Sequence, residues 1–322
     1  MFIIQYQKLL LIIGGIVMGG SLLLILSLGL NLGIDFTGGS LTEVAYTESV
    51  AKETVEAAVN EQNLGGFSVR ESIDEAGRDA YLIRTRDLNE TERVALSDKV
   101  TVLGEGGEVT RFTSIGPVIG QELKDKAGWA IFGVVSIIVL YVAFAFAGIG
   151  TPVSSWVYGT ITIFVLVHDV LVPTALVSVL GQLAGVEVDV LFVMALLAVL
   201  GYSVNDTIVV FDRVRENLMQ NRTEHRKKHT EPGGIVREEV TYTLTKPYPE
   251  IVGTAVKQTL ARSINTSLTT MAALIALYFF GGTVTQTFAL VLFAGVLAGT
   301  YSSICLASPL AVAYATRKAE NK

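Results

Sequence analysis

Residues 201–217 read GYSVNDTIVVFDRVREN and close an apolar run that begins near residue 188. Asp206 precedes Arg213 by seven residues in this stretch, so in a helix its carboxylate would lie about 10 Å inside the charged end. Asp212 and Arg213 themselves suit the membrane interface. An ionisable group as deep as Asp206 is costly unless it faces a partner or a water-filled path, which makes it the first candidate functional residue.

Five further apolar runs flank this one, each long enough to cross a hydrocarbon core of about 30 Å as a helix. Together, the six predicted spans cover residues 9–30, 128–147, 153–179, 188–211, 264–281 and 284–312. The composition agrees, because 51% of the 322 residues are hydrophobic and only 17% are charged, which is more apolar surface than a soluble domain can hide. The first run is too long for a signal-peptide core, so we interpret it as an uncleaved span. The sequence predicts a membrane all-α bundle of six transmembrane helices.

Lys and Arg near the span ends orient these helices. Basic residues occur at Lys8, throughout residues 213–262 and in the tail at Arg317, whereas residues 180–187 contain none. The positive-inside rule therefore places both termini and residues 213–262 in the cytoplasm. Residues 31–126 are then expected to form one extracytoplasmic domain.

This orientation divides the chain into consecutive parts with different environments. They are residues 1–30 (cytoplasmic N-terminus and first span), 31–126 (extracytoplasmic domain), 127–212 (second to fourth spans), 213–262 (cytoplasmic loop and amphipathic helix), 263–313 (fifth and sixth spans) and 314–322 (cytoplasmic tail). Within the fourth part, residues 221–250 are polar and contain Pro232-Gly233-Gly234, which is typical of a loop. Residues 251–262 are expected to lie along the inner membrane surface as an amphipathic helix.

Residues 31–126 show a pattern of four strands and two helices. Strands are predicted at 40–46, 67–73, 79–85 and 108–115, and helices at 48–62 and from Asn89 onward. Glu92 lies three residues after Asn89, as in a capping box. The order βαββαβ is that of an α+β ferredoxin-like domain.

Polar residues within the spans give the remaining candidates. His168 and Asp169 lie near the middle of the third span, one turn before Pro173. The pair could have a functional role, or it could only form hydrogen bonds to neighbouring helices. Asn205, next to Asp206 in the fourth span, is a supporting polar residue.

The fifth span opens with the sequence ARSINTSLTT, which places Arg262, Asn265, Thr266 and Thr269 in a polar stripe on one helix face. Arg262 could extend to the cytoplasmic interface. The hydrogen-bonding residues that follow it favour a face that looks into the bundle.

Several of these stretches resemble the SecD/SecF family of protein-export membrane proteins, which belongs to the RND superfamily. Gly33-Ile34-Asp35-Phe36-Thr37-Gly38-Gly39 resembles the family's D-F-x-G-G signature. Residues 201–217 look like the fourth-span signature of its SecF members, and His168-Asp169 and the stretch from Arg262 match further positions. The matches run in the right order from residue 33 to 267.

The resemblance implies a function that composition does not show. It implies a subunit of the Sec translocase in the bacterial cytoplasmic membrane, which acts with SecD and the SecYEG channel on a translocating unfolded polypeptide. The proton-motive force would drive this work, with Asp206 as the proton-responsive carboxylate and Arg262 as its basic partner. We expect no cofactor beyond the proton, no metal site and no nucleic-acid partner.

Two other functions are compatible with parts of the pattern. A small-molecule exporter of the same superfamily would typically have a second large outer loop, whereas residues 180–187 are short. An intramembrane aspartyl protease would use two carboxylates such as Asp169 and Asp206, but Ser203-Val-Asn205-Asp206 departs from the G-x-G-D pattern of those enzymes. We therefore expect a transport component and not an enzyme.

Overall fold

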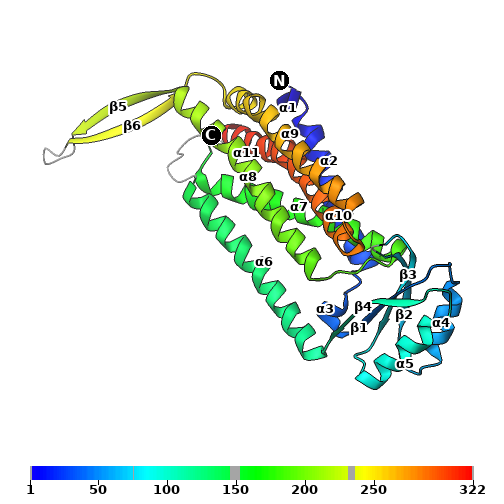
Figure 1. Cartoon of the computed structure of the whole chain (residues 1–322). Coiled ribbons are helices and arrows are strands. Elements are labelled where there is room, and N and C mark those ends of the chain that lie inside the picture. Colours follow the sequence, from blue (N-terminus) through cyan, green and yellow to red (C-terminus); the bar gives the residue numbers. More distant parts are fainter. Residues whose placement is uncertain (1, 75, 146–152, 231–235, 321–322) are drawn as a thin grey trace.

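The computed structural model describes residues 2–74, 76–145, 153–230 and 236–320. Figure 1 shows a long helical bundle with a small α+β domain at one end and a β-hairpin projecting from the other. We call residues 39–115 the sheet domain. The end of the bundle next to it is the sheet-domain end, and the opposite end is the hairpin end. The first and last helices, α1 (Phe2–Gln5) and α11 (Ser308–Glu320), lie at the hairpin end.

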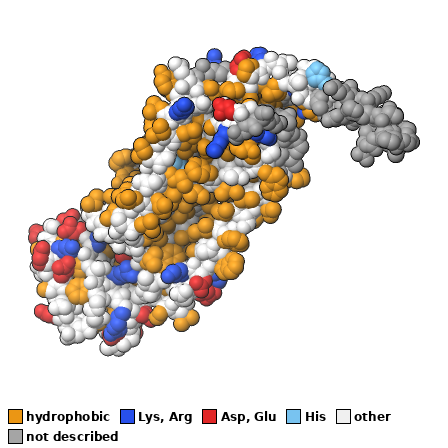
Figure 2. Space-filling view, turned by 180° about the vertical axis from the view of Figure 1, so that it is seen from behind, with side chains coloured by type: hydrophobic (Ala, Val, Ile, Leu, Met, Phe, Trp, Pro, Cys, Tyr) orange, Lys and Arg blue, Asp and Glu red, His pale blue; other side chains and the backbone are white. Residues whose placement is uncertain are grey.

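Six helical segments of the described chain are long and apolar enough to cross a membrane, as predicted. They are α2 (Gln7–Leu28), α6 (Pro117–Ala145), α7 (Ser155–Ala184), α8 (Val190–Gln220), α9 (Tyr248–Phe280) and α10 (Thr283–Ser302) with its continuation into α11. Hydrophobic side chains cover the flank of the bundle in Figure 2, while Lys, Arg, Asp and Glu gather toward its two ends. This distribution is the one expected of a chain that crosses a bilayer several times.

Helix α10 lies at the centre of the bundle, where it packs against α7, α8 and α9. Close approach depends on Gly295, because a Cβ there would come within 2.1 Å of Val199 on α8. After Ser302 the helix changes to a π-helical segment, η1 (Ser303–Ala307), before α11 begins. Such segments are rare and are often found at functional sites.

The sheet domain has the predicted order of elements. Its antiparallel sheet has the strand order β2-β3-β1-β4. The elements are β1 (Gly39–Ala45), α4 (Lys52–Asn60), β2 (Ser68–Ile73), β3 (Asp79–Thr85), α5 (Glu90–Thr101) and β4 (Glu108–Ile115). The predicted capping box is present, because Asn89 Oδ1 accepts from the backbone N–H of Glu92 and the Glu92 carboxylate accepts from that of Asn89.

Helices α4 and α5 cover one face of this sheet. Val55, Val59, Leu96 and Val100 pack against strand residues that include Ile83 to form the core of the domain. The opposite face carries polar side chains and looks toward the bundle. The hydrophobic alternation of the strands therefore fixes which face meets the rest of the protein.

The prediction of a loop at residues 221–250 was wrong. Strands β5 (Arg222–Thr230) and β6 (Val236–Leu244) form an antiparallel hairpin in register from Arg222 opposite Leu244 to Thr230 opposite Val236. Pro232-Gly233-Gly234 lies outside the described residues. Thr, Val and Tyr recur along the second strand, and these residues favour a strand even where the charge is high.

The separate amphipathic helix predicted at residues 251–262 is also not observed. Helix α9 begins at Tyr248 and continues without interruption through the span, and α8 extends to Gln220. Ile251, Val252 and Val256 are buried in the core of the bundle. The apolar stripe therefore packs against neighbouring helices rather than along the membrane surface.

Candidate functional site

Three of the predicted polar residues lie inside the bundle. His168 and Asp169 of α7 are 1% and 0% exposed, and Asp206 of α8 is 9% exposed. Ionisable groups buried this deeply require hydrogen-bonding partners, and in this chain the partners are mainly serine hydroxyl groups.

Asp169 is hydrogen-bonded on both carboxylate oxygens. Its Oδ1 lies 2.8 Å from His168 Nδ1, and its Oδ2 accepts from Ser203 Oγ on α8 and from Ser302 Oγ on α10, the latter over 2.8 Å. The His168 ring lies 6.0 Å from that of Tyr301, and its Nε2 has no hydrogen-bond partner among the described residues. The carboxylate therefore ties three helices together.

Asp206 lies on α8 one turn after Ser203, and its carboxylate is also hydrogen-bonded by serine hydroxyl groups on both oxygens. Its Oδ1 accepts from Ser263 Oγ of α9 over 2.5 Å, and its Oδ2 accepts from Ser303 Oγ at the start of η1. Within the described chain, no hydrogen bond joins Asp169 to Asp206. The two carboxylates thus have separate sets of donors, unlike the proton-sharing pair of an aspartyl protease.

Little in the sequence indicates these four serines. Ser203, Ser263, Ser302 and Ser303 are all buried, but serine is a common small residue within spans. The nearest signal was the consecutive pair Ser302-Ser303 in an otherwise apolar run.

The polar stripe of α9 does not look into the bundle in this chain, contrary to the prediction. Arg262, Asn265, Thr266 and Thr269 are exposed, and so is Asn205 on α8. The threonine hydroxyls bond to carbonyls of their own helix, Thr266 to Arg262 over 2.9 Å and Thr269 to Asn265 over 3.1 Å.

The face of α9 that does point inward carries Ser263 and Ser267, about 100–140° around the helix from Arg262. No hydrogen bond or ion pair joins Arg262 to Asp206 within the described residues. The basic residue expected to pair with Asp206 thus lies on the outer surface of this chain.

The glycine-rich motif forms a junction at the sheet-domain end. The backbone N–H of Gly33 donates to the Val188 carbonyl over 2.8 Å, and Phe36 of the short helix α3 (Ile34–Thr37) packs in a cluster with Phe192 of α8. Asp35 Oδ2 accepts from the backbone N–H of Val190 over 2.9 Å. The motif therefore connects the segment after the first span to the start of α8.

Gly38 and Gly39 make close contacts that no other residue could make. Both have positive φ, at 72° and 123°. A Cβ on Gly38 would lie 2.8 Å from the Pro117 Cα of α6, and one on Gly39 would lie 2.5 Å from the Thr85 carbonyl oxygen of β3. The two glycines allow the sheet domain and α6 to meet at one point.

Asp189, just before α8, is a second carboxylate at this junction. Its Oδ1 accepts from the backbone N–H of Phe192 over 2.8 Å. Burial raises the pKa of Asp189; the bond from Phe192 opposes this rise and the nearby Asp35 adds to it. Both acidic side chains occupy the positive end of the helix dipole of α8.

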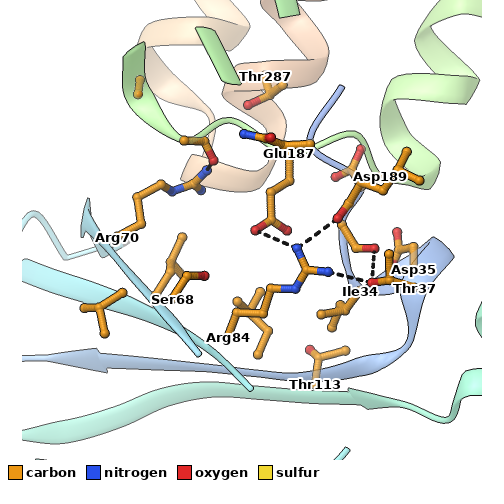
Figure 3. Close-up of a pocket in the computed structure, with 18 of the residues that line it drawn as sticks. Ile34, Asp35, Thr37, Ser68, Arg70, Arg84, Thr113, Glu187, Asp189 and Thr287 are labelled. Carbon is orange, nitrogen blue, oxygen red and sulfur yellow. Dashed lines mark hydrogen bonds and ion pairs between the residues drawn. The ribbon is translucent and has the colours of Figure 1, made fainter. Parts of the chain in front are cut away.

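A cavity of about 1200 Å³ lies between the sheet and this end of the bundle. Arg84 of β3 crosses it and donates to the Leu32 carbonyl over 2.8 Å, to Thr37 Oγ1 over 2.6 Å and to Glu187 Oε1 over 3.4 Å (Figure 3). Arg70 of β2 donates to the Gly185 carbonyl. These arginines anchor the polar face of the sheet to the loops of the bundle.

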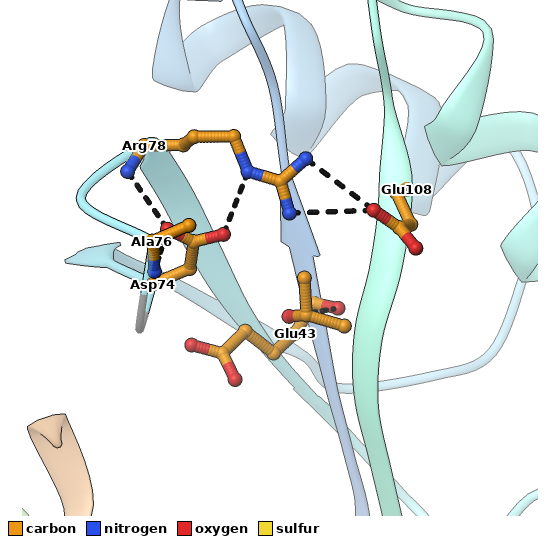
Figure 4. Close-up of polar contacts among 6 residues, drawn as sticks. Glu43, Asp74, Ala76, Arg78 and Glu108 are labelled. Atoms are coloured by element: carbon orange, nitrogen blue, oxygen red, sulfur yellow. Dashed lines mark hydrogen bonds and ion pairs between the residues drawn. The ribbon is translucent and has the colours of Figure 1, made fainter.

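A second polar cluster joins the turn between β2 and β3 to the start of β4 (Figure 4). Asp74 accepts from the backbone N–H of Arg78 and from its Nε, both over 2.7 Å, and Arg78 also reaches Glu108 of β4 over 3.3 Å. Burial alone would raise the pKa of Asp74, but the hydrogen bonds and the charge of Arg78 outweigh it and lower the pKa below its usual value.

Comparison with known proteins identifies the family that this architecture belongs to. Residues 96–232 and 235–317 match the family described as "Protein export membrane protein SecD/SecF, C-terminal", and residues 23–50 match the SecD/SecF GG motif. The chain is 36% identical to protein translocase subunit SecF of Thermobaculum terrenum, over 85% of this chain and 80% of that protein. It is 34% identical to the SecF of Sebaldella termitidis, over 83% and 77%.

Among solved structures, the crystal structure of the translocon-associated membrane protein SecDF from Thermus thermophilus is similar, with a TM-score of 0.79 and 29% identity. The match covers 99% of this chain and 38% of the SecDF chain, so this protein corresponds to a little over a third of that one. With the matches to individual SecF subunits along most of their length, the chain belongs to the SecD/SecF family of protein-export membrane proteins, as one of its SecF members.

Proposed function

We propose that this chain is the SecF subunit of a bacterial Sec translocase and that it promotes protein export across the cytoplasmic membrane. The observation that supports this most strongly is its similarity to proteins named translocase subunit SecF over 80% of the Thermobaculum protein. Those relatives are named as translocase subunits and not as hydrolases, in keeping with a transport component.

Protonation of Asp206 is the event that we propose couples the proton-motive force to this work. The residue is buried in the bundle and is held by hydroxyl groups from two other segments, Ser263 and Ser303. A change in its charge therefore alters contacts among several helices at once. Each proton that crosses contributes about 2.3 kcal/mol per 100 mV of membrane potential.

We propose that SecD covers the exposed polar face of α9. Arg262 and Asn265 would be costly to leave against lipid, and the hydroxyls of Thr266 and Thr269 add to the polar character of this surface. Relatives named SecDF exist, as in Thermus thermophilus. A second bundle packed on α9 would also bring its own polar groups close to Arg262.

The arrangement in the membrane is a further part of the proposal. Both termini and the hairpin would lie in the cytoplasm, because Lys8 and Arg317 lie near that end, and the sheet domain would lie outside. Its strand order β2-β3-β1-β4 supports a ferredoxin-like fold. There it would meet the unfolded polypeptide that leaves the SecYEG channel.

Export driven by the proton-motive force in membrane vesicles tests the coupling. Asp206→Asn should abolish the stimulation of export that a proton gradient gives, while Ser308→Ala, which changes another buried polar residue, should not. Export by the Asp206→Asn protein at the normal rate would contradict the proposed role. Co-purification from native membranes should recover SecD with the wild-type chain and less of it with Arg262→Leu.

A further inference from the structure

Ser302 and Ser303 are consecutive residues that bind different carboxylates. Ser302 Oγ donates to Asp169 on α7, and Ser303 Oγ donates to Asp206 on α8. Both serines are fully buried, at 0% exposure. Neighbouring residues of a helix point about 100° apart, so the pair reaches two of the helices that α10 packs against, α7 and α8.

Each of these hydroxyl groups also has a second acceptor on its own helix. Ser302 Oγ lies 3.1 Å from the Gly299 carbonyl oxygen, and Ser303 Oγ lies 3.2 Å from that of Thr300. A hydroxyl has one proton to donate and can accept with its lone pairs. The serine proton therefore goes either to the carboxylate or to the backbone carbonyl.

The protonation state of the carboxylate decides between these two arrangements. An ionised Asp206 only accepts, so Ser303 must donate to it. A protonated Asp206 carries an O–H that can donate to Ser303 Oγ, and the Ser303 proton then turns to the Thr300 carbonyl. The only covalent change is the new O–H bond of the carboxylic acid. The same reasoning applies to Asp169, Ser302 and Gly299.

This change in the direction of the serine hydrogen bond takes place where the helix changes its backbone hydrogen-bond pattern. The α-helical hydrogen-bond pattern of α10 ends at Ser302, and the π-helical segment begins at Ser303. The carbonyls of Gly299 and Thr300 belong to the last turn before this change. A serine proton that moves to or from these carbonyls therefore alters hydrogen bonding at the transition from α10 to η1.

We propose that Ser302 and Ser303 are positioning residues that link the protonation of Asp169 to that of Asp206 through the junction of α10 and η1. The inference rests on the proposed role of Asp206 in proton coupling. Ser302 and Ser303 would be the groups through which a proton on one carboxylate changes the hydrogen bonding of the other.

Other titratable side chains lie on the elements around this centre and must be considered with it. Those within about two turns of the two carboxylates or their serine partners include His168 on α7, Tyr202 and Asp212 on α8, Arg262 on α9, Tyr301 on α10 and Cys305 on η1. His168 contacts Asp169 directly, and Tyr301 donates to the Leu10 carbonyl of α2 over 2.9 Å. α2 meets η1 at Gly14, which does not titrate.

Infrared difference spectroscopy of the full-length chain in lipid nanodiscs, recorded as a function of pH, tests this proposal. The carbonyl stretch of each protonated carboxylic acid is assigned by its loss in Asp206→Asn or Asp169→Asn. Ser303→Ala should move the Asp206 band to higher wavenumber because a hydrogen bond is lost, and Ser303→Thr, which keeps the hydroxyl, should leave it in place. Ser302→Ala should do the same to the Asp169 band.

Ser308→Ala is the matched control. Ser308 is a buried serine of the adjacent turn, and its Oγ has no hydrogen-bond partner among the described residues, so neither band should move. Ser303→Cys, whose thiol is a weaker donor, gives an intermediate shift and serves where Ser303→Ala does not fold.

A second measurement tests the link between the two carboxylates. Asp169→Asn should shift the pH at which the Asp206 band appears, and this shift should be roughly twofold smaller when Ser302 and Ser303 are both alanine. An equal shift in both backgrounds would overturn the proposal, as would band positions unaffected by either serine or an Asp206 band missing at every pH. Loss of export in Asp206→Asn is measured separately, so the two proposals can fail independently.

Discussion

Asp35 accepts a hydrogen bond from the backbone N–H of Val190 across 2.9 Å, so a side chain that follows the first span occupies the first turn of α8. The helix that begins there carries Asp206 further along its length. One continuous helix, α8, therefore connects the junction at the sheet-domain end with the buried carboxylate of Asp206.

Replacing Asp35 should loosen this junction. Asp35→Ala removes an acceptor at a helix N-terminus and should lower the free energy of unfolding by about 0.5–2 kcal/mol, whereas Asp35→Asn retains a carbonyl acceptor and should lose less. Thermal unfolding in detergent measures both. Asp98→Asn, a change on the exposed surface of α5, is the control, and equal losses in all three variants would contradict the assignment.

Gly39→Ala should be much more harmful than an ordinary glycine replacement. The new Cβ would meet the Thr85 carbonyl oxygen at 2.5 Å, and the φ of 123° disfavours any side chain. We expect a loss of about 1–3 kcal/mol in stability. Gly66→Ala, where a Cβ would have no atom within 4 Å, should leave the melting temperature nearly unchanged, and equal effects at both positions would contradict the contact.

Gly295→Ala should push α10 away from α8. Its Cβ would lie 2.1 Å from a methyl group of Val199, and overpacking of this kind costs about 1–3 kcal/mol. Gly15→Ala on α2 has open space and makes the same change in helix propensity. The difference in unfolding free energy between the two variants isolates the packing effect, which should be absent if the helices can separate freely.

Acid should weaken the turn between β2 and β3 through Asp74. Because its pKa is lowered in the folded protein, this carboxylate contributes stability above its usual pKa of about 3.9, and that contribution is lost as the pH falls through the folded value. Asp74→Asn should remove this part of the pH dependence and speed amide exchange in β2 and β3 at neutral pH. Hydrogen exchange of the full chain measures both effects, and exchange identical to wild type would contradict them.

The sequence predicted most of the helices and strands because their signals are local. Apolar length identified the six spans, and the pattern around Asn89 identified the start of α5 with its cap. The hairpin is hard to predict because residues 221–250 have the polar composition of a loop, which masks the strand propensity of residues such as Val240 and Tyr242.

The site was only partly predictable for a different reason. An ionisable residue within a span requires a hydrogen-bonding or charged partner, so His168, Asp169 and Asp206 could be identified as candidates. Polarity alone does not determine which side of a helix faces its own bundle, because a polar face can point outward, as that of α9 does. For this reason polarity predicts an inward position for the stripe at Arg262, although Ser263 next to it is the residue that faces the bundle.

The hairpin is attached to the end of α8, the helix that carries Asp206. The helix has 31 residues, about 46 Å at 1.5 Å per residue. The hairpin follows α8 directly, with its base closed by the bond from the Thr245 N–H to the Asn221 carbonyl over 2.9 Å. The hairpin projects sideways from the end of α8 (Figure 1), so a tilt of α8 would carry β5 and β6 through a longer distance than the end of the helix itself.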